Sequence, residues 1–211
     1  MNEYLRKQKD ILLETTKKAL EANGMKVVIL ENKEEVIPYI DHILEKGEKV
    51  SVGGSQTLFE AGIIDYLMNR KDLIFYNRYE KDVNTREVFL RSFLTDYYFS
   101  SSNAITMDGY LYNVDNIGNR VAALIYGPQK VVIIAGENKI VRNKEEARQR
   151  VANIAGPANS MRLKMDNPCV KTGVCVNCHS KQRLCNIETI IGYQKDPERY
   201  TVILIKEDLG Y

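Results

Sequence analysis

Short apolar segments alternate with segments of helical period along most of this chain of 211 residues. The apolar segments are rich in valine and isoleucine and have the length of buried strands, whereas the intervening segments have the apolar spacing of amphipathic helices. This alternation predicts a mainly parallel β-sheet with helices on both faces, because parallel strands need crossover connections. The expected strands cover residues 25–30, 50–54, 72–76, 96–105, 130–136 and 201–211, and the expected helices cover 1–24, 33–47, 56–70, 85–94, 119–126 and 144–156.

Two of these helices carry predictions about single residues. The first helix is expected to end at Gly24, and the helix over 144–156 is expected to stop at Gly156 and Pro157, since glycine and proline commonly terminate helices. The buried positions expected in the first helix include Leu5, Ile11, Leu12 and Leu20.

The charge of the chain is nearly balanced. Its 30 Lys and Arg and 28 Asp and Glu residues give a formal net charge of +2. The sequence contains 13 tyrosines but no basic cluster with interleaved aromatics, so a nucleic-acid partner is not expected. The N-terminal segment is charged from its third residue, and no window approaches the roughly 20 apolar residues of a membrane span. We therefore expect a cytoplasmic protein without a membrane span.

The composition changes to Pro, Cys, Asn, Lys and Gly towards the end of the chain. We expect a main α/β domain over residues 1–157 and a cysteine-rich metal-binding module over 158–194. Residues 195–211 are expected to supply a strand that returns to the main sheet.

The module contains all four cysteines, Cys169, Cys175, Cys178 and Cys185, in the pattern C-x5-C-x2-C-x6-C. In a reducing cytosol, cysteines clustered in one loop are expected to hold a metal rather than form disulfides. The surrounding segment also has too few apolar residues to fold without a crosslink. We favour a [4Fe–4S] cluster, and a structural zinc ion is the alternative.

A glycine turn follows the second expected strand. Gly53 and Gly54 precede Ser55, Gln56 and Thr57 at the start of the next expected helix. Free backbone N–H groups and the positive end of a helix suit such a turn to a phosphate or carboxylate. The spacing matches neither a P-loop nor a dinucleotide fingerprint. A helix cap by Ser55 without any ligand is the alternative.

A dense run of polar residues follows the strand expected at 96–105. Asp108 and Asp115 are candidates for proton transfer or hydroxyl binding, and Arg120 could hold a carboxylate or pair with Asp115. Lys139 is a candidate second cation for the ligand. The further hydrogen-bonding candidates are Asn103, Thr106, Asn113 and Asn119.

This polar run also admits a plain interpretation, in which residues 107–110 form a hairpin turn with no ligand. The topology favours the ligand interpretation. The carboxyl ends of parallel strands lie at one edge of a sheet, so the glycine turn and the polar run are expected to face the same ligand.

These motifs resemble the lactate-utilisation (LUD) domain family. The similarity rests on N-A-I-T-x-D-G-x-L-x-N-V-D-x-x-G-N-R-V-A-A from residue 103, on G-P-x-K-V and N-K-I-V downstream, and on VSVGGSQTLFEAGI upstream. The resemblance implies a three-layer α/β fold similar to the ribose-5-phosphate isomerase and CoA-transferase superfamily. The chain would represent a cysteine-containing branch with a C-terminal four-cysteine module.

The resemblance also implies a function. It indicates a protein that binds a small anionic or phosphorylated ligand and is linked to oxidation of lactate or a related hydroxy acid, beside iron–sulfur oxidoreductase subunits. Whether the chain is itself an enzyme, such as an oxidoreductase component, stays open. One alternative is an isomerase or transferase acting on a sugar phosphate or CoA ester, and another is a non-catalytic ligand-binding subunit with a structural zinc.

Overall fold

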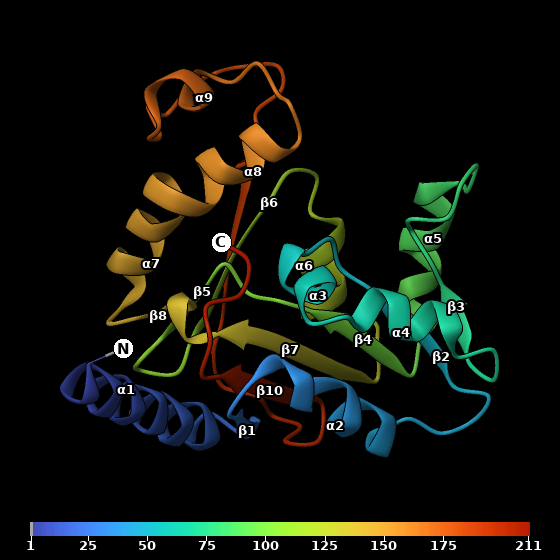
Figure 1. The fold of residues 1–211 in the computed structure, drawn as a ribbon. Helices are drawn as coiled ribbons and strands as arrows, with labels where there is room; N and C mark the ends of the chain where they lie inside the picture. Colours follow the sequence, from blue (N-terminus) through green and yellow to red (C-terminus); the bar gives the residue numbers. More distant parts are fainter. Residues whose placement is uncertain (1) are drawn as a thin grey trace.

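Two β-sheets form the framework of the protein in the computed structural model, which describes residues 2–211 (Figure 1). The larger sheet is parallel, in the order β1-β10-β7-β4-β2-β3. In the smaller sheet, β8-β5-β6-β9, β6 is antiparallel to both neighbours and β8 is parallel to β5. The strands are β1 (Lys26–Leu30), β2 (Lys49–Val52), β3 (Ile74–Tyr76), β4 (Tyr97–Ser100), β5 (Ala104–Thr106), β6 (Leu111–Asp115), β7 (Lys130–Gly136), β8 (Ile140–Val141), β9 (Ile187–Ile191) and β10 (Tyr200–Ile205).

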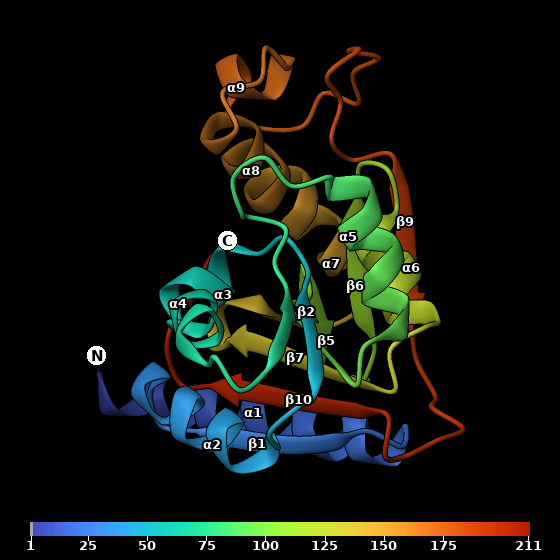
Figure 2. The same ribbon diagram turned by 90° about the vertical axis from the view of Figure 1, so that its right-hand side faces the viewer.

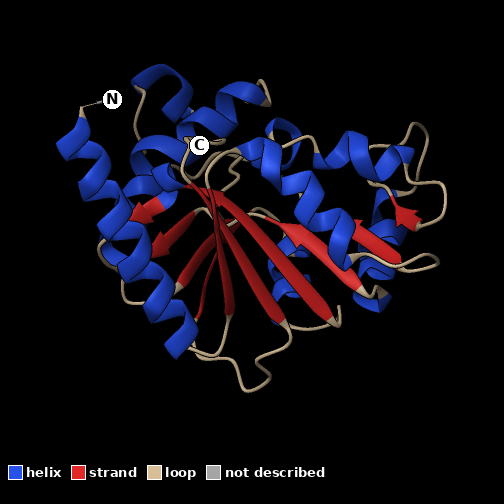
Figure 3. Cartoon of the chain, turned by 60° about the horizontal axis from the view of Figure 1, so that its bottom comes forward, coloured by secondary structure: helices blue, strands red, loops and turns tan. Residues whose placement is uncertain are grey.

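Helices lie on both sides of the fanned strands (Figure 3). Most of them are short, and the segment expected as one helix over 56–70 is divided at Gly62, whose φ of 71° ends the first part. The helices are α1 (Glu3–Ala22), α2 (Val36–Ile43), α3 (Gln56–Glu60), α4 (Ile63–Asn69), α5 (Thr85–Arg91), α6 (Asn119–Ile125), α7 (Lys144–Arg150), α8 (Gly156–Arg162) and α9 (Pro168–Thr172).

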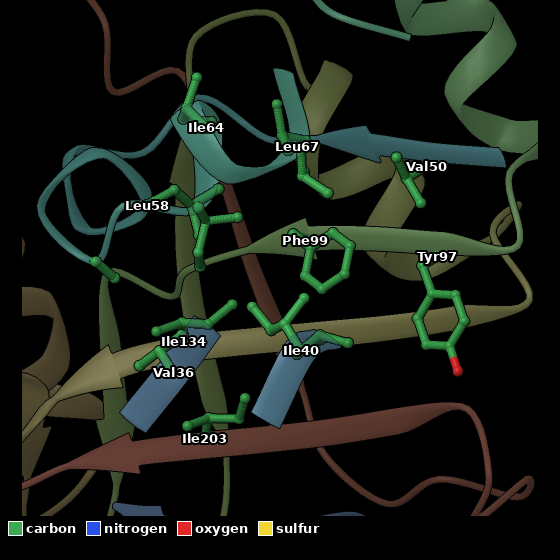
Figure 4. Packing of buried hydrophobic residues seen from close by; sticks show 14 of the residues in the cluster. Val36, Ile40, Val50, Leu58, Ile64, Leu67, Tyr97, Phe99, Ile134 and Ile203 are labelled. Atoms are coloured by element: carbon green, nitrogen blue, oxygen red, sulfur yellow. The ribbon is translucent and has the colours of Figure 1, made fainter. Parts of the chain in front are cut away.

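The two faces of the larger sheet are buried in two separate apolar cores. Alternate residues of β7 point to opposite faces, as strand geometry requires. Val132 and Ile134 join the core with α2, α3 and α4, part of which is drawn in Figure 4. Val131 and Ile133 join the core with α1, α6 and the inner face of the smaller sheet. The expected α/β class with a mainly parallel sheet is therefore confirmed.

The smaller sheet was not predicted. Ile105 and Leu111 face the core shared with the larger sheet, while Ala104 and Tyr112 face α7. Its central strands β5 and β6 are therefore buried on both faces, whereas the edge strand β9 is mostly exposed. A strand buried on both faces lacks the alternation of apolar and polar residues by which a half-buried strand is normally detected.

The buried face of α1 differs from the predicted one. Leu13, Thr16 and Leu20 are buried, whereas Leu5 and Ile11 are 54% and 58% exposed. The expectation was right for Leu20 and wrong for Leu5 and Ile11, because the helix turns the stripe of Leu13, Thr16 and Leu20 towards β1 and the core. Leu12 is half-buried.

The helix expected over 144–156 does not stop at Gly156 and Pro157. It continues from α7 through a π-helical turn, Val151–Ala155, directly into α8. In this turn the N–H of Gly156 donates to the carbonyl of Val151, and a Cβ at residue 156 would lie 2.9 Å from that oxygen. Pro157 has no N–H to donate and is accommodated at this irregular turn, where the carbonyl of Ala152 accepts a hydrogen bond from the Cys175 N–H instead.

Residues 158–194 are tied to the main body at both ends. They begin within α8 and end with β9, which pairs along the whole length of β6 (Figure 2). The following strand, β10, lies between β1 and β7 in the larger sheet. Within residues 2–211, no helix combines the length and the apolar character needed to cross a bilayer.

Candidate functional site

A cavity of about 430 Å³ lies beyond the carboxyl ends of β2, β4 and β7. We call it the main cavity. Its walls come from the start of α3, the loop after β4, the turn between β6 and α6, and α8. Two stretches of sequence that are far apart in the chain thus face the same space. The predicted site residues that line it are Gly54, Ser55, Gln56, Asn103, Asp115, Asn119, Arg120 and Lys139.

Thr106 and Asp108 lie elsewhere, at the far end of β5. They belong to the hairpin turn between β5 and β6, where the Thr106 hydroxyl accepts a hydrogen bond from the Tyr110 N–H at 3.0 Å. Asp108 is exposed beside Gly109, whose φ is 86°. The plain hairpin interpretation describes this part of the polar run, and we do not assign Thr106 or Asp108 a role at the main cavity.

Gly53 and Asn113 lie behind the cavity wall and contact Arg120. A Cβ at residue 53 would lie 2.8 Å from the Ser100 hydroxyl and 3.0 Å from Cγ of Arg120, so glycine permits the close approach of these groups. The Asn113 amide oxygen accepts from Nη1 of Arg120 at 2.6 Å. Both residues support the wall rather than face the cavity.

Arg120 is a buried hub that holds three segments together. Its Nη1 donates to the carbonyl of Ser101 at 2.9 Å, which lies just after β4. Its Nη2 donates to the Asn103 amide oxygen at 2.8 Å and to the carbonyl of Val114 at 3.1 Å. Because this guanidinium is only 9% exposed and its donors are engaged, Arg120 shapes the cavity and is not free to grip a ligand bidentately.

Asp115 is the partner of Arg120 and also caps α6. One carboxylate oxygen accepts from the backbone N–H groups of Arg120 and Val121, both at 3.0 Å. The other accepts from Nε of Arg120 at 2.9 Å. The structure thus shows the internal pair that was one of the two sequence interpretations of Arg120. With its oxygens occupied, Asp115 is poorly suited to proton transfer.

Lys139 is buried, with 3% of its surface exposed, and it lines the main cavity. Its amine donates to the hydroxyls of Thr57 at 2.7 Å and Ser101 at 3.0 Å. Within residues 2–211 it forms no ion pair. Burial, aided by the positive charges of Arg150 and Arg120, lowers the pKa of Lys139 to about 7, against an opposing effect of Glu60.

Arg78 was not predicted and lies at the opposite wall. A Cβ at residue 54 would come within 3.1 Å of its Nη1, so the guanidinium rests on the glycine turn. It lies over the Phe89 ring, 4.8 Å from the centroid, and near Tyr79. In the described part of the chain it has neither a hydrogen bond nor a carboxylate partner. Its position just after β3, the strand beside the glycine turn, is the sequence signal that could have identified it.

Several other polar side chains of the main cavity have no protein partner among residues 2–211. Ser55 occupies the cap position of α3 but makes no capping hydrogen bond. The amides of Gln56 and Asn119 are also without partners and line the cavity. Because α3 has only five residues, its dipole contributes little, and side chains dominate the electrostatics. The cationic side chains are Arg78, Arg120, Lys139 and Arg162, against the single carboxylate of Asp115.

The four cysteines line a second cavity of about 420 Å³, which we call the cysteine cavity. All four are free thiols. Within residues 2–211, no three His, Cys, Asp or Glu side chains converge closely enough to hold a single metal ion. The thiols therefore surround a space instead of meeting at one point.

This arrangement bears on the two predicted metal groups. Zinc binds thiolates at about 2.3 Å, which requires four sulfurs to converge on one point. A [4Fe–4S] cluster takes the same number of cysteines but has a volume of its own, so its ligands stand further apart. The four thiols that line one cavity match the number and type of ligands that either group requires. Arg183 lines the cavity as well, and its positive charge would offset that of thiolates.

The fold and the cavities describe an α/β protein with a polar, cation-lined cavity at the carboxyl edge of a parallel sheet. The chain belongs to the LUD domain family, whose model matches residues 13–205. This family is linked in general to lactate utilisation. The recognition of the family from sequence motifs is thus confirmed.

One solved structure gives an independent comparison of the fold. The crystal structure of a DUF162 family protein from Deinococcus radiodurans is similar with a TM-score of 0.56 and 15% sequence identity, over 93% of this chain and 98% of that chain. At this identity the similarity supports the fold alone. A comparison with curated proteins gave no match.

Proposed function

We propose that this protein binds a small anion carrying a carboxylate or phosphate in the main cavity. The observation that carries the proposal is Arg78, a guanidinium on the cavity wall with no carboxylate partner within residues 2–211. Lys139 adds a second cation without an ion pair. Cations gathered in a cavity with low-dielectric walls favour an anionic ligand, and a guanidinium suits the planar geometry of a carboxylate or the oxygens of a phosphate.

The remaining polar groups favour a ligand that also carries hydroxyl groups. Gln56 and Asn119 offer both amide donors and acceptors, and Ser55 offers a hydroxyl. A hydroxy acid such as lactate combines a carboxylate with one hydroxyl, and this chemistry agrees with the general link of the family. We therefore propose a role in oxidation of lactate or a related hydroxy acid, with iron–sulfur proteins as partners.

The arrangement supports ligand binding more strongly than isomerase or transferase chemistry. Asp115 is the only carboxylate side chain lining the main cavity in residues 2–211, and its oxygens are engaged by α6 and Arg120. Asp108 lies at the hairpin turn. Lys139 is left as the group able to exchange a proton near pH 7. A catalytic role would therefore depend on Lys139 rather than on the carboxylates.

Replacement of Arg78 with alanine is expected to weaken binding of inorganic phosphate or L-lactate about 10- to 100-fold, because a charge-assisted hydrogen bond contributes about 1.5–3 kcal/mol. Isothermal titration calorimetry at low ionic strength measures the effect. Arg142→Ala is the matched control, since Arg142 is exposed, pairs with Glu146 on α7 and lies outside both cavities. Equal affinities in Arg78→Ala and wild-type protein would contradict the proposal.

We also propose that the cysteines bind a [4Fe–4S] cluster. Protein purified without oxygen is expected to be coloured and to contain about four iron atoms per chain, and Cys175→Ser is expected to lose most of the colour. Iron, sulfide and zinc analyses with a visible absorption spectrum provide the measurement. Colourless protein with one zinc would instead support the structural-zinc alternative.

A further inference from the structure

The main cavity and the cysteine cavity share a wall. Five residues line both spaces, and they come from β6, the π-helical turn, the start of α8 and the cysteine loop. Cys185 is the one cysteine among them. The shared residues are Val114, Val151, Gly156, Leu184 and Cys185.

The π-helical turn, Val151–Ala155, forms much of this wall. Ala152 faces only the cysteine cavity, whereas Ala155 faces only the main cavity, so the turn separates the two spaces by the width of one helix. The carbonyl of Ala152 accepts a hydrogen bond from the Cys175 N–H at 2.9 Å. The irregular turn therefore contacts both the ligand space and the cysteine loop, and such turns are frequent at functional sites.

Arg183 fixes the cysteine closest to the wall. Its Nη1 donates to the carbonyl of Cys178 at 2.6 Å, and its Nε donates to the carbonyl of Cys185 at 3.1 Å. The backbone at both cysteines is thereby held in place, with Cys185 adjoining both cavities. Its neighbour Leu184 fills the same wall.

We propose that the two cavities form one coupled site, in which a cluster held by the four cysteines senses the anion in the main cavity through the wall at Cys185. This inference rests on the proposed function, since it needs both the anion and the cluster. The coupling has a definite sign. Reduction adds negative charge beyond the wall, so the reduced protein binds an anion more weakly, and by reciprocity the anion disfavours reduction.

The test compares phosphate binding in the oxidised and reduced states of anaerobically purified full-length protein. Electrochemical reduction is used because it adds no competing anion. We expect affinity for phosphate to fall about three- to fivefold on reduction, the size given by unit charges about 10 Å apart at an effective dielectric constant of about 40. Phosphate is also expected to change the electron paramagnetic resonance spectrum of the reduced protein.

Variants separate the coupling from binding itself. Arg78→Ala is expected to keep the colour and the spectrum but to lose the spectral change caused by phosphate. Arg142→Ala is expected to keep the colour, the spectrum and the spectral change. Tight phosphate binding with equal affinity in both redox states and an unchanged spectrum would overturn the coupling and leave the anion-binding function intact. Failure of phosphate and lactate to bind in either state would overturn the proposed function itself. Absence of a redox-active cluster would overturn the coupling alone.

Discussion

Replacing Arg120 with alanine is expected to lower the free energy of unfolding by about 3–5 kcal/mol, the typical cost of breaking a buried ion pair by removing one partner. The change leaves the carboxylate of Asp115 buried without its guanidinium and removes the donors to Ser101, Asn103 and Val114. Urea unfolding followed by far-ultraviolet circular dichroism measures the loss.

Two further variants identify the cause of this loss. Arg148→Ala is the control, because Arg148 is 70% exposed and stands 3.9 Å from Glu188, and its removal should change stability by at most about 0.5 kcal/mol. The double variant Arg120→Ala, Asp115→Ala should be less destabilised than the sum of the two single changes, since neither charge is then left unpaired. A decrease in the free energy of unfolding below about 1 kcal/mol in Arg120→Ala would show that the contacts of Arg120 contribute little to stability.

The larger sheet could be predicted because its strands are continuous apolar segments between amphipathic helices. The segment 130–136, for example, is buried on both faces and has the composition expected of a central parallel strand. The smaller sheet could not be predicted in this way. Its strands β5 and β8 have only three and two residues, too few to display a period, and β9 lies in a segment dominated by loop-forming residues.

The location of a site residue could be predicted where it depends only on which strand the residue follows. The glycine turn and Asn103 face one cavity because they follow β2 and β4 of the same parallel sheet, whereas Asp115 and Arg120 reach this cavity from the end of β6 in the smaller sheet. Which polar groups are free was not predictable, since that depends on contacts between distant residues. The guanidinium of Arg120 is paired with Asp115 and hydrogen-bonded to the loop after β4. The guanidinium of Arg78, in a loop without any motif, is unpaired within the described residues.

The protein is expected to become more stable as the pH rises from about 7.5 to 9.5, with Lys139 contributing up to about 1.4 kcal/mol per pH unit. Burial lowers the pKa of this amine from the ordinary 10.5 to about 7. Between these values the unfolded chain binds the proton and the folded chain does not, so raising the pH favours the folded state. The destabilisation caused by burying the Lys139 amine is fully present below pH 7 and disappears as the pH rises towards 10.5. Urea unfolding at a series of pH values measures the slope.

Lys139→Met isolates this contribution. The other titrating groups contribute equally to the slope of unfolding free energy against pH in both proteins, so the difference between the two slopes is due to Lys139. The substitution keeps most of the side-chain volume, and the Thr57 and Ser101 hydroxyls retain their hydrogen bonds to the carbonyls of Leu209 and Ser102. Identical slopes in the two proteins would show that Lys139 keeps its ordinary pKa. The same proton links stability to the ligand: only the charged amine attracts an anion, so phosphate affinity is expected to fall above pH 7 in the wild type more steeply than in Lys139→Met.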